Sequence, residues 1–186
     1  MKGARDRDAF AEFSTYGKDT AMTSLALLLV RLMIGLGLAA HGAQKGFGWF
    51  GGKGFKATGN FFESLGYRPG SLFVGLAVTG EVAGGVLTAA GLFGPAGPAL
   101  IILVMIVAAG TIHLKNGFFS QNGGYELNAL YSVAALALAF AGPGNLSLDA
   151  AFGIRTYFTE TVNAVTIAAG MVFGFINLGL RRPTTA

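Results

Sequence analysis

The stretch "SLALLLVRLMIGLGLAAHGAQKGFGWFGG", residues 24–52, decides the fold class of this chain. Residues 24–42 are almost entirely apolar, and the run approaches the ~20 residues that a helix needs to cross about 30 Å of hydrocarbon. The stretch then ends in a glycine-rich segment that carries His41 and Lys45. A membrane-spanning helix that ends in this way predicts a polar site at one face of the membrane.

Further apolar segments follow, separated by Gly-Pro pairs that favour turns, and they cover residues 72–93, 96–114, 124–142 and 162–180. The last segment contains two asparagines and follows a long connection, so the sequence leaves open whether it spans the membrane. We therefore predict an all-α membrane protein, a four-helix transmembrane bundle plus a fifth, C-terminal helix. This fifth helix is expected to pack peripherally with Gly170 and Gly174 facing inward, because small residues four apart let helices approach closely.

The composition agrees with a membrane protein. Of the 186 residues, 53% are hydrophobic and 12% are charged, about half the ~25% that soluble domains carry. The chain contains no cysteine, which excludes thiolate catalysis and cysteine-ligated metals as its own chemistry. The net charge of +4 is spread along the chain, whereas nucleic-acid binding needs a clustered basic face, so we expect no nucleic-acid partner.

The charge pattern divides the chain into a polar tail, residues 1–22, and a membrane domain, residues 23–182. Met22 directly precedes the apolar run and is an alternative start. The first segment could instead be a cleaved signal peptide, although its apolar run is longer than is usual for one. Lysine and arginine are too evenly divided between the two faces to decide the orientation.

Antiparallel helices would bring several polar side chains to one membrane face. His41 ends the first segment, His113 ends the third and Glu126 opens the fourth. We predict that these three residues surround one cavity beneath residues 44–71, with Lys45 at its rim. The alternatives are that the histidines only bond to loop carbonyls and that Glu126 only favours the positive end of its helix.

Two charges lie inside the apolar segments. Counted from the helix ends at 1.5 Å per residue, Arg31 and Glu81 reach similar depths on consecutive helices. Because an isolated charge at the bilayer centre costs at least ~2.5–3.5 kcal/mol, we predict an intramembrane ion pair between Arg31 and Glu81. This pair could be a purely structural link between two helices.

The order of several short motifs resembles the DoxX family of small bacterial integral membrane proteins over about residues 25–150. These motifs are HG-x-x-K after the first helix, a glutamate followed by glycines in "GEVAGG", "HLKNGFF" before "GYE", and the closing "GPGNLSLD". The resemblance implies a four-helix membrane fold. The namesake of the family is a membrane subunit of a thiosulfate:quinone oxidoreductase, and other members are associated with membrane redox complexes.

Three functions remain open at this point. The first is a membrane subunit of a quinone-linked oxidoreductase in the bacterial inner membrane, a multi-pass protein with a protein partner that carries the electrons. The second is a non-catalytic membrane anchor or assembly factor, and the third is a small-solute transporter. We predict no metal site and assign no catalytic residue. Quinone is the cofactor that the polar face could bind, whereas no spacing makes the two histidines face each other as a bis-histidine haem site requires.

Overall fold

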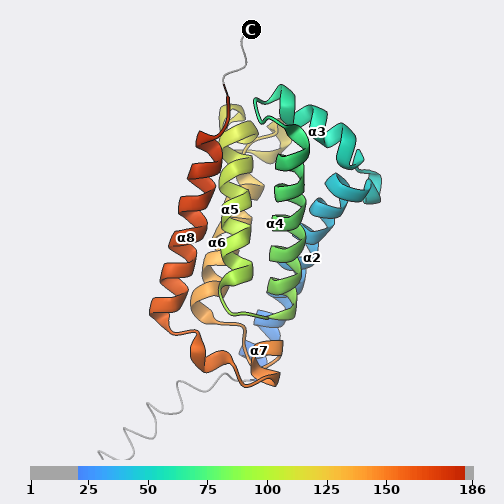
Figure 1. Cartoon of the computed structure of the whole chain (residues 1–186). Helices are drawn as coiled ribbons and strands as arrows, with labels where there is room; N and C mark the ends of the chain where they lie inside the picture. The colour runs from blue at the N-terminus through green and yellow to red at the C-terminus, as the bar shows by residue number, and fades with distance from the viewer. Residues whose placement is uncertain (1–20, 183–186) are drawn as a thin grey trace, which may run out of the picture.

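The computed structural model describes residues 21–182, and these residues form helices and connecting loops without a strand (Figure 1). The main helices are α2 (Ala21–Phe47), α4 (Gly70–Ala90), α5 (Ala96–Ala108), α6 (Glu126–Ala141) and α8 (Glu160–Gly179). Helix α5 continues through a π-helical turn, η2 (Ala109–His113), and a 3₁₀ turn, η3 (Leu114–Asn116). The predicted all-α membrane fold is confirmed. The predicted polar tail lies outside the described residues, except for Ala21 and Met22, which begin α2.

Within the described part of the chain, four helices are long and apolar enough to cross a membrane: Ala21–Phe47, Gly70–Ala90, Ala96–Asn116 and Glu160–Gly179. The C-terminal helix, for which the sequence left open whether it spans the membrane, is among them. Helix α6 is apolar but shorter. Its 16 residues give a rise of about 24 Å, which falls short of the hydrocarbon thickness.

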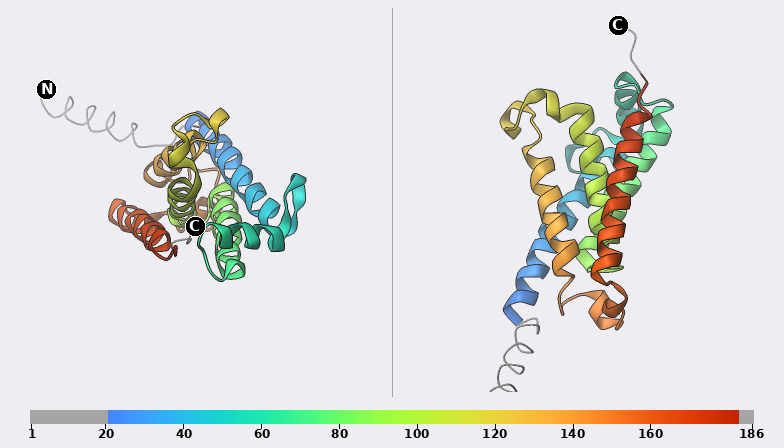
Figure 2. Two further views of the ribbon diagram at one scale, coloured as in Figure 1. Left: turned by 90° about the horizontal axis from the view of Figure 1, so that it is seen from above. Right: turned by 90° about the vertical axis from the view of Figure 1, so that its left-hand side faces the viewer.

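The helices run alternately up and down, and α5 lies between α4, α6 and α8 (Figure 2). Its side chains Ile101, Ile102, Val104 and Met105 are buried and form most of the hydrophobic core. One end of the bundle, the upper end in Figure 1, carries the short helix α3 (Gly54–Ser64). The opposite end carries α7 (Leu148–Ala151) and the 3₁₀ turn η5 (Arg155–Tyr157).

Helices α2 and α4 touch backbone to backbone through two glycines. A Cβ atom on Gly35 would lie 2.7 Å from the Ala89 nitrogen, and one on Gly85 would lie 2.7 Å from the Ala39 nitrogen. Both distances are shorter than a carbon–nitrogen contact allows, so each position needs glycine. Close approach of this kind favours helix association in lipid, where packing replaces the hydrophobic effect.

Helix α8 packs mainly on α5, and its glycines face that helix. Gly170 and Gly174 are buried. A Cβ atom on Gly170 would lie 2.6 Å from the Ala99 carbonyl oxygen, and one on Gly174 would lie 3.2 Å from the Ile106 side chain. The predicted inward-facing glycine pair of a peripheral fifth helix is therefore confirmed.

Candidate functional site

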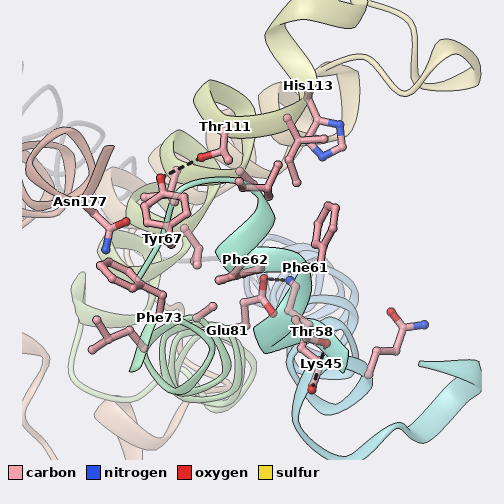
Figure 3. A pocket seen from close by; sticks show the side chains of 18 of the residues that line it. Lys45, Thr58, Phe61, Phe62, Tyr67, Phe73, Glu81, Thr111, His113 and Asn177 are labelled. Carbon is pink, nitrogen blue, oxygen red and sulfur yellow. Dashed lines mark hydrogen bonds and ion pairs between the residues drawn. The ribbon is translucent and has the colours of Figure 1, made fainter. Parts of the chain in front are cut away.

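A cavity of about 400 Å³ lies beneath α3 at the upper end of the bundle (Figure 3). Its walls come from the end of α2, from α3 and α4, from α5 with η2, and from the end of α8. Most of the lining is apolar, and aromatic rings contribute much of it: Phe61, Phe62 and Phe73. Polar side chains gather at two places on this apolar wall.

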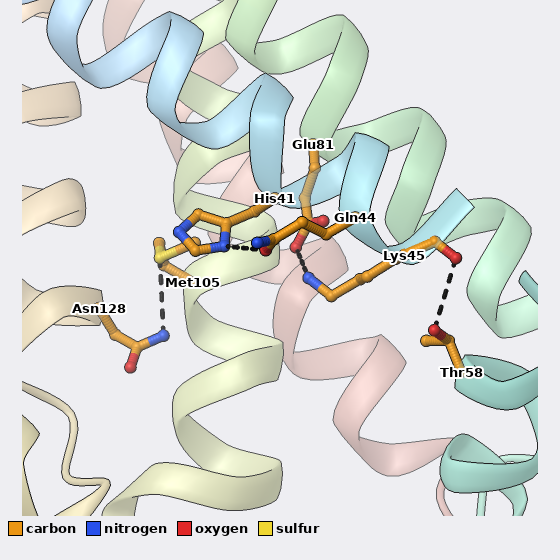
Figure 4. A network of polar contacts seen from close by, with 7 residues as sticks. All are labelled: His41, Gln44, Lys45, Thr58, Glu81, Met105 and Asn128. Atoms are coloured by element: carbon orange, nitrogen blue, oxygen red, sulfur yellow. Dashed lines mark hydrogen bonds and ion pairs between the residues drawn. The ribbon is translucent and has the colours of Figure 1, made fainter. Parts of the chain in front are cut away.

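The first polar place is an ion pair between Lys45, in the last turn of α2, and Glu81 on α4 (Figure 4). The Glu81 side chain is 4% exposed and the Lys45 side chain 31%. The Lys45 ammonium donates to Oε1 of Glu81. The second oxygen, Oε2, is buried and has no hydrogen-bond partner among the described residues. The site therefore holds a carboxylate with unused acceptor capacity.

Helix α3 is fixed over this pair by Thr58. The Thr58 hydroxyl donates to the Gly54 carbonyl at 2.8 Å and lies 3.4 Å from the Lys45 carbonyl oxygen. The other end of α3 is held by Glu63, which accepts a hydrogen bond of 2.8 Å from the Gly70 backbone at the start of α4. The roof of the cavity is thus hydrogen-bonded to both helices that carry the ion pair.

The second polar place is a buried hydrogen bond of 2.9 Å between the hydroxyls of Tyr67 and Thr111. Thr111 lies in the π-helical turn η2, a feature that often occurs at functional sites. His113 from the same turn also lines the cavity, with its Nδ1 2.7 Å from the Gly123 carbonyl oxygen, and Asn177 from α8 completes this wall (Figure 3).

The predicted shared site of four residues is only partly correct. Lys45 and His113 line the cavity, whereas His41 and Glu126 do not. His41 is exposed, and its Nδ1 lies 3.2 Å from the Gln44 side-chain oxygen. Glu126 accepts a hydrogen bond of 2.8 Å from the Ser120 backbone and so orders the loop before its own helix. All four residues lie at the predicted end of the bundle, but two of them face other surroundings.

The predicted ion pair between Arg31 and Glu81 is wrong, because Lys45 is the partner of Glu81. Gly42 packs against Val82, so Glu81 lies level with Gly42 on α2. Arg31 lies eleven positions earlier on that helix, roughly 16 Å away along its axis. The end of the first apolar run is not level with the start of the second, as the predicted depths required, because Gly42 lies beside Val82. In the structure α2 continues to Phe47, and the first turns of α4 extend beyond it to contact α3.

Arg31 is buried at the opposite end of the bundle, beside the loop that precedes α7. Its Nη2 donates to the Leu146 carbonyl, while Nε and Nη1 have no partner among the described residues. Asp149, which is 0% exposed, supplies the opposite charge in this region. The two Asp149 oxygens accept hydrogen bonds of 2.8 Å from the Phe93 backbone and 2.7 Å from the Gly94 backbone. This cluster joins the connection between α4 and α5 to the loop after α6.

Nearly all the cavity residues, most of α2 and the whole of α4 fall within the match to one sequence family. Residues 26–114 match the family model described as DoxX. The chain carries a DoxX domain. The DoxX match includes Lys45, Glu81 and His113 and every other cavity residue except Asn177, and it ends before α6 begins. No curated protein and no solved structure matches the chain.

Sequence reasoning missed the Lys45–Glu81 pair and the Tyr67–Thr111 hydrogen bond. A signal for the first was available, since the chain carries Lys45 and Glu81 on consecutive segments of the DoxX domain. If the first helix had been predicted to end at Phe47, Lys45 would have been placed inside it and available to pair with Glu81. The second had no sequence signal, because Tyr67 lies in a connecting segment and Thr111 is a single polar residue in an apolar run.

Proposed function

We propose that this membrane protein is a subunit of a quinone-linked oxidoreductase and that the cavity beneath α3 binds the quinone head group. The observation that carries the proposal is the Lys45–Glu81 ion pair on the wall of a largely apolar cavity of about 400 Å³. This volume lies within the ~300–1,000 Å³ that is usual for small-molecule sites, which combine apolar walls with a few polar groups.

A quinone head group matches these features chemically. Its flat ring suits the aromatic wall of Phe61, Phe62 and Phe73. One ring carbonyl would accept a hydrogen bond from the Lys45 ammonium, which is a strong, charge-assisted donor. Reduction of a quinone to a quinol takes up two electrons and two protons, and Glu81, with one unpartnered oxygen, can hold a proton beside the ring.

The electrons would come from a partner protein that carries a redox centre such as a flavin, a haem or an iron–sulfur cluster. Two of the bundle's outer helices, α2 and α8, expose most of their surface and are available to lipid or to such a partner. In this proposal the chain crosses the bacterial cell membrane several times, and the described residues begin and end at opposite faces. Reporter fusions at the two ends would test that topology.

The test is a titration of the purified, detergent-solubilised protein with a short-chain ubiquinone analogue, followed by calorimetry. We expect Lys45→Met and Glu81→Gln to weaken binding about tenfold or more, as the loss of a hydrogen bond to a charged group implies. His41→Ala and Glu126→Gln are matched controls, because both residues lie off the cavity wall. Unchanged affinity in both cavity variants, with the fold intact by circular dichroism, would exclude the proposed site.

The anchor or assembly function predicts a different result in the native membrane complex. If the ion pair is only structural, Glu81→Gln reduces the amount of complex recovered with its partner and leaves the activity per complex unchanged. If the pair binds quinone, the complex forms in normal amounts and its quinone-dependent activity falls. Co-purification with the partner followed by an activity assay separates the two.

A further inference from the structure

A second pocket, of about 200 Å³, lies at the opposite end of the bundle, between the end of α6 and the start of α8. It is lined by residues 138–143 and by Gly94, Arg155, Phe158, Glu160 and Asn163. The pocket shares no residue with the cavity beneath α3, and Gly94 is its one lining residue within the DoxX match. This pocket is therefore a candidate binding site separate from the cavity beneath α3.

The pocket is rich in hydrogen-bond acceptors. Asn163 is 7% exposed, and its Oδ1 atom is buried without a partner among the described residues. The Glu160 carboxylate lies one helical turn away, in the first turn of α8. The last turn of α6 also faces the pocket, and the final carbonyls of a helix lack intrahelical partners and carry partial negative charge. These groups together fit a compact cationic donor such as a primary ammonium group.

The pocket also contains one cationic side chain, Arg155, whose Nη1 donates to the Asn145 side-chain oxygen. Its guanidinium is suited to bind a phosphate, which accepts several hydrogen bonds at once. A ligand that places an ammonium group beside a phosphate would satisfy both halves of the pocket. The adjoining surface includes the apolar side chain of Phe140, which lines the pocket and is 58% exposed. Acyl chains could lie along that surface.

We propose that this pocket binds the head group of a phospholipid with a primary ammonium group, that is, a phosphatidylethanolamine. Its ammonium group donates to Asn163 Oδ1, to Glu160 and to the carbonyls that end α6, while its phosphate accepts from Arg155. Phosphatidylcholine cannot make the first set of hydrogen bonds, because its quaternary ammonium has no N–H. The pocket therefore distinguishes two lipids of equal net charge.

The test is native mass spectrometry of the full chain in detergent micelles that contain phosphatidylethanolamine or phosphatidylcholine with the same acyl chains. The wild-type protein should retain phosphatidylethanolamine about tenfold more than phosphatidylcholine. Asn163→Leu and Glu160→Gln should each remove most of that preference. Thr161→Val, at an exposed position on the same helix and off the pocket wall, should keep it.

Three results would overturn the proposal. The first is equal retention of both lipids by the wild-type protein. The second is a preserved preference in the Asn163→Leu and Glu160→Gln proteins, with their folding checked by circular dichroism. The third is displacement of the lipid by an equal concentration of glycerophosphoethanolamine. That result would assign the pocket to a free solute, because the acyl chains would then add nothing to binding.

Discussion

Replacing Lys45 with methionine tests whether the buried charge of Glu81 depends on its partner. The Glu81 side chain is 4% exposed, so this variant leaves a carboxylate in apolar surroundings with neither oxygen paired by a cation. Removing one member of a buried ion pair typically costs about 3–5 kcal/mol. Because the Lys45 side chain is 31% exposed, water can partly replace it, and we expect a loss near the lower value, about 3 kcal/mol at pH 7.

The assay is denaturant-induced unfolding in detergent at pH 7, followed by circular dichroism. Lys56→Met is the matched control, since Lys56 is exposed on α3 and does not line the cavity. The double variant Lys45→Met/Glu81→Gln should recover more than half of the loss, because no charge is left buried. The reasoning fails if Lys45→Met is no more destabilising than Lys56→Met, or if the two substitutions at the pair are additive.

Two further predictions concern the packing of the bundle. Gly35→Leu should destabilise the fold by at least the ~1–3 kcal/mol of an overpacked core, because even a Cβ at this position would lie 2.7 Å from the Ala89 nitrogen. Denaturant-induced unfolding in detergent measures this loss, and an unchanged unfolding midpoint would contradict the prediction. Asp149→Ala should lower the free energy of unfolding by about 2–3 kcal/mol, because the Phe93 and Gly94 N–H groups lose their acceptor. Asp149→Asn should lower it less, because the amide oxygen can still accept one of these hydrogen bonds. Equal losses in the two variants would show that the hydrogen bonds contribute little.

The membrane fold could be predicted from sequence because each span leaves a long apolar run between turn residues. The facing of α8 could be predicted too, since Gly170 and Gly174 recur at helical spacing. The ion pair could not, because it depends on the axial register of α2 against α4. Each residue by which a helix end is misplaced shifts depth by 1.5 Å and turns the side chain by about 100°. The glycine contacts that set this register, at Gly35 and Gly42, are tertiary and leave no periodic pattern in the sequence.

The same uncertainty explains why only part of the polar face was predicted correctly. Topology alone places His41, His113 and Glu126 at one end of the bundle, and there they lie. Which of them faces the cavity depends on local geometry: the π-helical turn directs His113 to the cavity, whereas His41 leaves the α2 surface on another side. A π-turn adds one residue to a helical turn and so changes the facing of every residue after it.

The two buried carboxylates among residues 21–182, Glu81 and Asp149, differ in how their oxygens are hydrogen-bonded. Asp149 uses both of its oxygens on backbone N–H groups. A carboxylate whose function is to hold the fold together is expected to be satisfied in this way, because each unpaired buried acceptor costs about 1–3 kcal/mol. Glu81 instead keeps Oε2 unpartnered and lines a cavity of about 400 Å³. The fold therefore tolerates the cost of an unpaired acceptor at Glu81. The Thr58 hydroxyl on the cavity wall does not satisfy it, because it donates to the Gly54 carbonyl. In the proposed function a ligand would donate to this unused acceptor, and a quinol hydroxyl would be such a donor.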